Sequence, residues 1–259
     1  MTPALVMGVL NVTPDSFSDG GRYLDRDAAI EHGLRLWREG AAYVDVGGES
    51  TRPGAAPVDP DEERTRVVPV IEALVAAGVR VSVDTRTAAV AEASIAAGAS
   101  MLNDVSASLH EVAAAAGVAW VAMHMRGEPG TMQDAPVYDD VVAEVRSFLV
   151  ERADAALAAG VPEVWIDPGI GFGKTAAHNL SLLRHVDLLV ETGHPVLVGT
   201  SRKRFLGALT GGADEDDRLE GTLATCTWVA ATGVKMVRVH DVAPAVEAMR
   251  IVGEEVVQP

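Results

Sequence analysis

The sequence has 259 residues, of which 48% are hydrophobic and 22% charged, and its formal net charge is −16. This composition is that of a globular chain, so it excludes a disordered or fibrous protein. So acidic a chain repels nucleic acid and anionic membranes, and we expect neither as a partner. Its one cysteine, Cys226, excludes an internal disulfide, and its first apolar run is too short for a signal peptide or a membrane span. Both features favour the cytoplasm.

Short apolar runs alternate with segments of helical periodicity from one end of the chain to the other. Nearly continuous hydrophobicity in short runs is typical of parallel strands that are buried on both faces. The expected strands are residues 5–10, 43–46, 80–83, 100–103, 119–123, 163–166, 195–198 and 235–239. The main expected helices are residues 26–38, 61–77, 88–97, 139–158, 178–191, 216–231 and 243–252.

Glycines stand where helical segments end before the next strand, which is the usual left-handed helix stop. They are Gly40, Gly78, Gly98, Gly117, Gly160, Gly193 and Gly233.

Eight such strand–helix units, with no linker rich in proline or serine, predict an α/β protein with a single (β/α)8 TIM barrel over residues 1–259. The alternative is an open, doubly wound parallel sheet with its ligand at a switch point of strand order. In a barrel the active site lies at the carboxyl ends of the strands. Polar residues are concentrated there in this sequence, which indicates an enzyme.

Gly173, Lys174 and Thr175 resemble the end of a phosphate-binding P-loop, but Pro168 occupies a position that the pattern reserves for glycine. We therefore interpret this segment as a mobile, glycine-rich loop that lets Phe172 approach a ligand. Zinc-site spacing such as HExxH is missing, which makes a zinc hydrolase the poorer interpretation. Only three of the 21 lysine and arginine residues are lysines, namely Lys174, Lys203 and Lys235. In a sequence that prefers arginine so strongly, these lysines are candidates for sites that require a compact charge.

Two sets of polar residues at expected strand ends are candidates for ligand binding. Arg238 and His240 alternate at the end of the last strand and so share a face, where a positive pair near Arg52 would suit a phosphate. Asp84, Asn103 and Asp167 end three other strands, and buried carboxylates there need partners. A planar heterocycle with adjacent N–H donors would supply them, whereas the alternative is that these residues cap loops or helices.

Eight ordered segments resemble the dihydropteroate synthases, the pterin-binding TIM barrels that sulfonamides target in folate synthesis. The segments are residues 7–20, 45–54, 82–85, 103–106, 123–125 with 131–133, 167–172, 201–203 and 238–242. The resemblance implies a transferase that joins 4-aminobenzoate to 6-hydroxymethyl-7,8-dihydropterin diphosphate, releases pyrophosphate by an SN1-like course, and forms a homodimer. The alternatives are a methyltetrahydrofolate methyltransferase that shares the pterin floor, or a catalytically silent paralogue.

By motif position, the resemblance implies a role for each candidate residue. Asp84, Asn103, Asp167 and Lys203 would hold the pterin, and Asn11 would bind the Mg²⁺ on the diphosphate. The diphosphate would contact Thr51, Arg52, Arg238 and His240. Ser201 would receive the carboxylate of 4-aminobenzoate, and its ring would lie against Pro53, Phe172 and Lys203. Of these, the implied catalytic residues are Asp84, Lys203, Arg238 and His240.

Overall fold

The computed structural model describes residues 2–13, 22–50, 58–128, 130–214 and 217–253. Eight parallel strands in these residues form one sheet, in the order β6-β5-β4-β3-β2-β1-β8-β7. They are β1 (Leu5–Asn11), β2 (Tyr43–Gly47), β3 (Val81–Asp84), β4 (Met101–Asp104), β5 (Ala119–Met123), β6 (Val164–Asp167), β7 (Leu197–Val198) and β8 (Met236–Val239).

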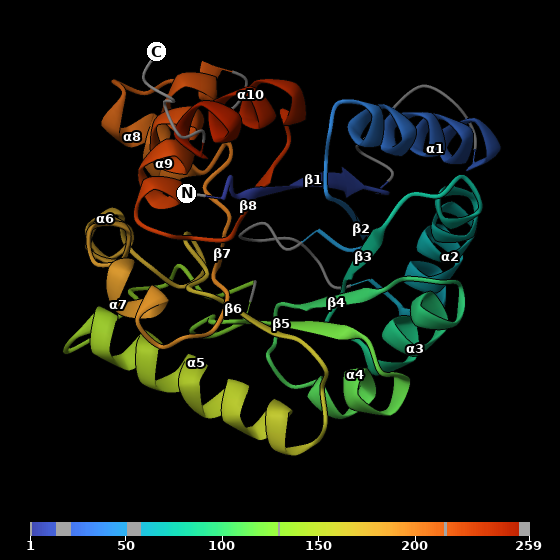
Figure 1. The fold of residues 1–259 in the computed structure, drawn as a ribbon, viewed down its shortest axis with the longest axis horizontal. Helices are drawn as coiled ribbons and strands as arrows, with labels where there is room; N and C mark the ends of the chain where they lie inside the picture. Colours follow the sequence, from blue (N-terminus) through green and yellow to red (C-terminus); the bar gives the residue numbers. More distant parts are fainter. Residues whose placement is uncertain (1, 14–21, 51–57, 129, 215–216, 254–259) are drawn as a thin grey trace, which may run out of the picture.

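The strands follow one another around the sheet in sequence order, and a parallel bridge between Ile166 and Val196 joins the β6 side to the β7 side. The helices lie outside the strands as a surrounding layer (Figure 1). The expected (β/α)8 barrel is thereby confirmed. The open doubly wound sheet is wrong, because such a sheet reverses its strand order at a switch point and keeps two free edges.

Ten helices occur in the described residues: α1 (Arg22–Arg38), α2 (Pro60–Ala76), α3 (Ala88–Ala96), α4 (His110–Ala116), α5 (Val141–Ala158), α6 (Ala176–Arg184), α7 (Asp187–Val190), α8 (Arg204–Leu209), α9 (Leu219–Ala231) and α10 (Val242–Gly253). All seven glycines expected to stop helices have φ between 67° and 107°, the left-handed conformation that glycine adopts most readily. Side-chain caps by Asp59, Asp140 and Thr175 fix where α2, α5 and α6 begin.

The helix expected over residues 178–191 is two helices, because the chain leaves helical geometry at His185. The helices α4 and α8 were not among the main expected ones. They have only seven and six residues, too few for a hydrophobic period to be read from sequence.

Alternation along the strands determines what lies inside the barrel. Most of the interior apolar layer consists of Met7, Tyr43, Met101, Val121, Trp165, Leu197 and Met236. Two residues further along their strands, on the same face, Tyr43 is followed by Asp45, Met101 by Asn103, Trp165 by Asp167 and Met236 by Arg238. Since all eight strands are parallel, these polar residues gather at the carboxyl end of the barrel, above an apolar floor.

Candidate active site

A buried cluster of opposite charges forms the bottom of the barrel mouth. The Arg238 guanidinium donates from Nε to Asp45 Oδ2 at 2.6 Å and from a terminal nitrogen to Asp84 Oδ2 at 2.7 Å. Asn103 donates its side-chain amide to the same Asp45 oxygen at 2.9 Å. Four strands thus place one network of two carboxylates, one guanidinium and one amide inside the barrel.

Burial and neighbouring charge act in opposite directions in this network. Burial raises the pKa of Asp84 to about 7, with Arg238 opposing the rise and Asp45 adding to it. Burial alone would lower the pKa of Arg238, but Asp45 and Asp84 raise it above its ordinary value. The guanidinium is therefore the fixed positive charge of this network, and it favours the ionised form of Asp84 against the effect of burial.

Each of the two carboxylates has one buried oxygen that accepts no hydrogen bond from the described part of the protein. Among the described residues, neither Asp45 Oδ1 nor Asp84 Oδ1 has a hydrogen-bond partner. Buried polar atoms are nearly always satisfied in native proteins, so two orphaned acceptors on carboxylates that share Arg238 indicate a ligand that carries N–H donors. Asp45 was not singled out from the sequence as a site residue. Its position two residues after Tyr43, on the inward face, is the signal that could have found it.

Asp167 lies at the barrel mouth and also caps the loop that follows it. It ends β6, and its Oδ1 accepts the backbone N–H of Gly169 at 2.7 Å. Burial raises its pKa, and Gly169 and the nearby Lys203 lower it. The capping interpretation thus holds for one oxygen of Asp167, Oδ1. At the end of β4 the corresponding capping carboxylate is Asp104, which bonds Ser106, Ser108 and Leu109.

Lys203 and Phe172 face each other at the mouth. Lys203 is the residue before α8, and its Nζ lies 4.1 Å from the centroid of the Phe172 ring. Burial lowers the pKa of Lys203 to about 8, and the charge of Asp167 opposes that fall. An ammonium on an aromatic face, next to two carboxylates, can hold a flat ligand by charge and by ring contact together.

His240 follows β8 and is tied to Ser201, which follows β7. Ser201 Oγ lies 3.0 Å from His240 Nδ1 and accepts the His240 backbone N–H at 3.2 Å. Burial, together with Arg238 and Arg202, lowers the pKa of His240 to about 3. The expected positive pair of Arg238 and His240 is therefore one guanidinium and one neutral imidazole. Arg202 is engaged by Asp241 through two hydrogen bonds of 3.1 and 2.8 Å.

Three implied contacts, Thr51, Arg52 and Pro53, lie outside the described residues. The chain that leads into and out of this segment is held at Glu49, which accepts from the Val58 backbone N–H at 3.4 Å and from Arg86 at 3.2 Å. Arg86 also bonds Glu128 at 2.9 Å, so one guanidinium links the loops after β2, β3 and β5. Sequence analysis did not find this link, because Arg86 lies 37 positions from Glu49 and 42 positions from Glu128.

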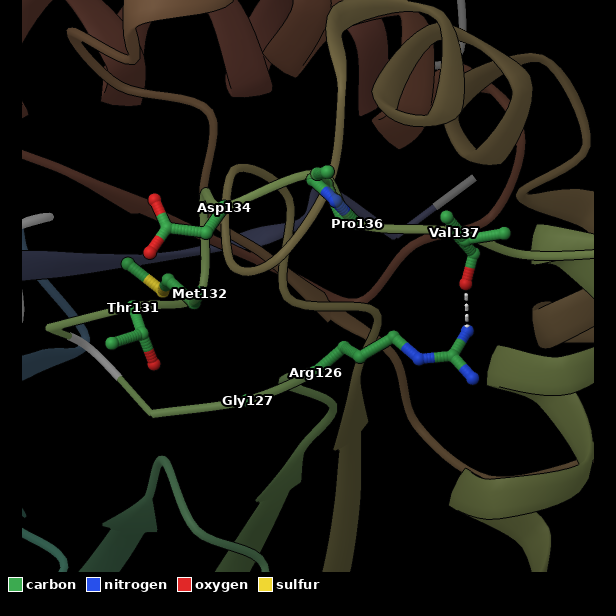
Figure 2. Close-up of a pocket in the computed structure, with 8 residues that line it drawn as sticks. Arg126, Gly127, Thr131, Met132, Asp134, Pro136 and Val137 are labelled. Carbon is green, nitrogen blue, oxygen red and sulfur yellow. Dashed lines mark hydrogen bonds between the residues drawn. The ribbon is translucent and has the colours of Figure 1, made fainter.

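The loop after β5 borders the mouth. Arg126 reaches across this loop to the Val137 carbonyl oxygen (Figure 2) and forms an ion pair with Glu144 at 3.1 Å. The residues around it line an open hollow of about 340 Å³. Of the implied ligand contacts that the structure describes, none lines this hollow.

Asn11 ends β1 on the inward face, opposite Gly47 of β2. Its amide oxygen is a hard ligand of the kind that Mg²⁺ accepts. Among the described residues, no three His, Cys, Asp or Glu side chains come together as a protein-held metal would require. A single amide oxygen fits a Mg²⁺ that arrives with a diphosphate, because Mg²⁺ is commonly held by few protein ligands, substrate phosphates and water. Within the same ranges, every helix is too short or too polar to cross a bilayer.

Comparison with known proteins agrees with this geometry. Residues 7–240 match the model of a family described as pterin binding enzyme. The dihydropteroate synthase of Mycobacterium leprae is 51% identical over 98% of this chain and 94% of its own length. The structure of Xanthomonas albilineans dihydropteroate synthase with 4-aminobenzoic acid is 50% identical, covers 96% of this chain and 92% of its own, and superimposes with a TM-score of 0.90. Its complex with 7,8-dihydropteroate is 47% identical, has the same coverage and a TM-score of 0.87.

Proposed function

We propose how the residues of this chain divide the work of catalysis, since the chain belongs to the dihydropteroate synthases, a family of pterin-binding enzymes. It is a transferase that joins 4-aminobenzoate to 6-hydroxymethyl-7,8-dihydropterin diphosphate and releases pyrophosphate. The methyltetrahydrofolate methyltransferase alternative is not favoured, because the relatives compared above are dihydropteroate synthases over nearly their whole length.

The observation that carries the residue assignment is the pair of orphaned carboxylate oxygens on Asp45 and Asp84. A pterin presents adjacent N–H donors along one edge, and charge-assisted bonds to buried carboxylates are stronger than bonds between neutral groups. Asn103 and Asp167 would complete the floor, and Lys203 would donate to an acceptor atom of the ring. Asp45 thus joins the pterin contacts implied by the family resemblance.

The chemical step breaks the bond between the pterin methylene carbon and the diphosphate oxygen, and it forms a bond from that carbon to the arylamine nitrogen. The methylene carbon gains positive character as the bond breaks, which the ionised form of Asp84 would favour. Negative charge grows on the departing diphosphate, where the Arg238 guanidinium, the His240 ring and Arg52 with Thr51 would stabilise it. The arylamine nitrogen then attacks in an SN1-like course and loses one proton to solvent.

The second substrate would lie beside Lys203 and the Phe172 ring, which are already in contact. Ser201 would bond its carboxylate, and the rings of Phe172 and Pro53 would enclose its ring. A Mg²⁺ on the diphosphate, held by Asn11, would neutralise charge on the leaving group when bound.

The exposed apolar residues Leu209, Trp228 and Ile251 lie on α8, α9 and α10, late in the chain. They support the proposal of a homodimer through these helices, which sedimentation equilibrium would test. The remaining proposal is a cytoplasmic location, in keeping with a single buried cysteine.

Pyrophosphate release tests the function directly. Purified protein with the pterin diphosphate should release pyrophosphate in step with 7,8-dihydropteroate when 4-aminobenzoate is present. A folded protein that binds the pterin diphosphate but forms no dihydropteroate would identify a catalytically silent paralogue.

A further inference from the structure

Lys174 is buried just behind the barrel mouth, directly after the glycine-rich β6–α6 loop, and only 3% of it is exposed. Its Nζ lies 2.9 Å from His124 Nδ1 and donates to the backbone carbonyls of His124, Gly169 and Phe172 at 3.2, 3.0 and 3.0 Å. An ammonium has three N–H donors, so these four acceptors satisfy it completely. A phosphate-binding role is excluded, because Lys174 has no donor left to give.

The loop before Lys174 is pressed against the start of the β5–α5 loop. A Cβ on Gly169 would lie 1.9 Å from the His124 carbonyl oxygen, and one on Gly173 would lie 2.2 Å from that of Arg126. Gln133 donates to the Gly171 carbonyl at 2.6 Å, and Tyr138 donates to that of Gly173 at 2.9 Å. The expectation of a mobile loop does not agree with this packing, which holds the backbone at several successive carbonyls.

The opposite side of the same loop carries groups of the active site. Gly169 donates to Asp167, and the Phe172 ring lies under the Lys203 ammonium. A Cβ on Gly171 would lie 3.2 Å from Lys203 Cδ, so the backbone there runs directly along that side chain. Lys174 bonds the backbone carbonyl of Phe172, and the ring of the same residue faces Lys203. Movement of this carbonyl therefore moves the ring.

The protonation of this cluster is set by its burial. Burial lowers the pKa of Lys174 to about 7, which Asp167 opposes and Lys203 reinforces. Burial and the adjacent Lys174 lower the pKa of His124 to about 3. A neutral His124 ring offers Nδ1 as an acceptor, which is the role that the 2.9 Å contact requires.

We propose that Lys174 is a positioning residue, whose ammonium joins the loops after β5 and β6 and so holds Phe172 against Lys203 at the 4-aminobenzoate subsite. This inference rests on the proposed function, because it takes Phe172 and Lys203 to contact 4-aminobenzoate. Lys174 itself touches neither substrate.

The test compares Lys174→Met with Lys235→Met, which makes the same change at an exposed lysine just before β8, at the opposite end of the barrel. Lys174→Met should raise the KM for 4-aminobenzoate by roughly tenfold or more, since a shift of about 1 Å in a positioned group can cost as much as a hundredfold. The dissociation constant of the pterin diphosphate should change by less than about threefold, because Asp167 is itself held by β-pairing to Met123. Lys235→Met should leave both constants unchanged.

A Lys174→Gln variant provides the conservative rescue, because its amide can still donate to two of the carbonyls. Its KM for 4-aminobenzoate should lie between those of the wild type and Lys174→Met. If circular dichroism shows that Lys174→Met does not fold, Lys174→Gln takes its place in the test. Folded Lys174→Met or Lys174→Gln protein with an unchanged KM for 4-aminobenzoate would overturn the inference, as would equal losses for both substrates.

Phe172→Ala, measured in parallel, separates failure of this inference from failure of the proposed function. If Phe172→Ala raises the KM for 4-aminobenzoate and the Lys174 variants do not, the positioning role is wrong while the subsite stands. If Phe172→Ala leaves that KM unchanged, the proposed subsite is wrong, and the positioning role falls with it.

Discussion

Arg238 is the residue on which the bottom of the barrel mouth depends, since its guanidinium bonds both Asp45 and Asp84. When a charged residue is removed from this site, its former partners stay buried without their opposite charge. Two buried carboxylates without their guanidinium would repel each other and lose their strongest donor. Lys174 and Lys203 act differently, because each is placed where a point charge rather than a planar fork fits.

Arg238→Met should therefore destabilise the protein by about 3 kcal/mol, the low end for breaking a buried ion pair, since the arginine is partly exposed. Urea unfolding at pH 7 measures it. The triple variant Asp45→Asn, Asp84→Asn, Arg238→Met removes the stranded charges and should recover part of that loss. A loss in the triple variant as large as in Arg238→Met would show that packing, and not charge, sets the cost.

Lys203→Arg should be nearly as harmful as Lys203→Ala, although it keeps the charge. The ammonium lies 4.1 Å from the Phe172 ring centroid, and the Gly171 backbone runs along its side chain, so a broader guanidinium does not fit without displacing the loop. Steady-state kinetics of both variants decide it. If Lys203→Arg retains more than about a third of wild-type kcat/KM, a deficit under about 0.7 kcal/mol, then Lys203 acts only as a replaceable positive charge.

Among the elements, the β6–α6 loop departs furthest from an ordinary connection. Three of its glycines, at 169, 171 and 173, have positive φ, and two of them meet a carbonyl oxygen of the β5–α5 loop at less than ordinary contact distance for a Cβ. Gly169 and Gly173 therefore allow the two loops to approach each other closely, in addition to adopting a positive φ. Gly160, which ends a helix, has the same sign of φ but open space around it.

This difference makes Gly160→Ala a matched control for Gly169→Ala. Both changes impose the left-handed penalty of about 1–2 kcal/mol on an L-residue. Only Gly169→Ala adds a clash with the His124 backbone, so it should destabilise more and lower kcat/KM by at least about tenfold through displacement of the loop. Thermal unfolding and kinetics of the pair test this, and equal effects of the two changes would contradict it.

In the whole molecule, burial of neutral imidazoles couples stability to pH. The pKa of His124 is lowered from 6.5 to about 3 in the folded protein, first by burial and then by Lys174. Between those values the unfolded chain binds a proton that the folded protein does not. By linkage, the free energy of unfolding then falls as pH falls from 6.5 toward 3.

His124→Asn should reduce that acid dependence. The histidine contributes a slope of up to about 1.4 kcal/mol per pH unit, which the variant loses because asparagine does not titrate. Urea unfolding of both proteins between pH 4 and 8 measures the slopes. The two curves should run parallel above pH 7 and converge below pH 6, and parallel curves throughout would show that the folded histidine is protonated normally.

The sequence by itself determined the eight strand–helix units, the glycines that end helices, and the gathering of Asp84, Asn103 and Asp167 at the carboxyl ends of strands. These features depend on local periodicity and backbone preference, which neighbouring residues carry. The family resemblance added the reaction.

Only the tertiary structure decided the partners of these residues. Arg238 bonds Asp45 across 193 positions of sequence, so the arginine expected to bind an anion also has a carboxylate partner inside the barrel. His240 is neutral and Lys174 is enclosed by carbonyls because of how deeply each is buried and which charges surround it. Such properties arise from contacts between strands and loops distant in sequence, and closure of the barrel is what brings those groups within hydrogen-bond distance.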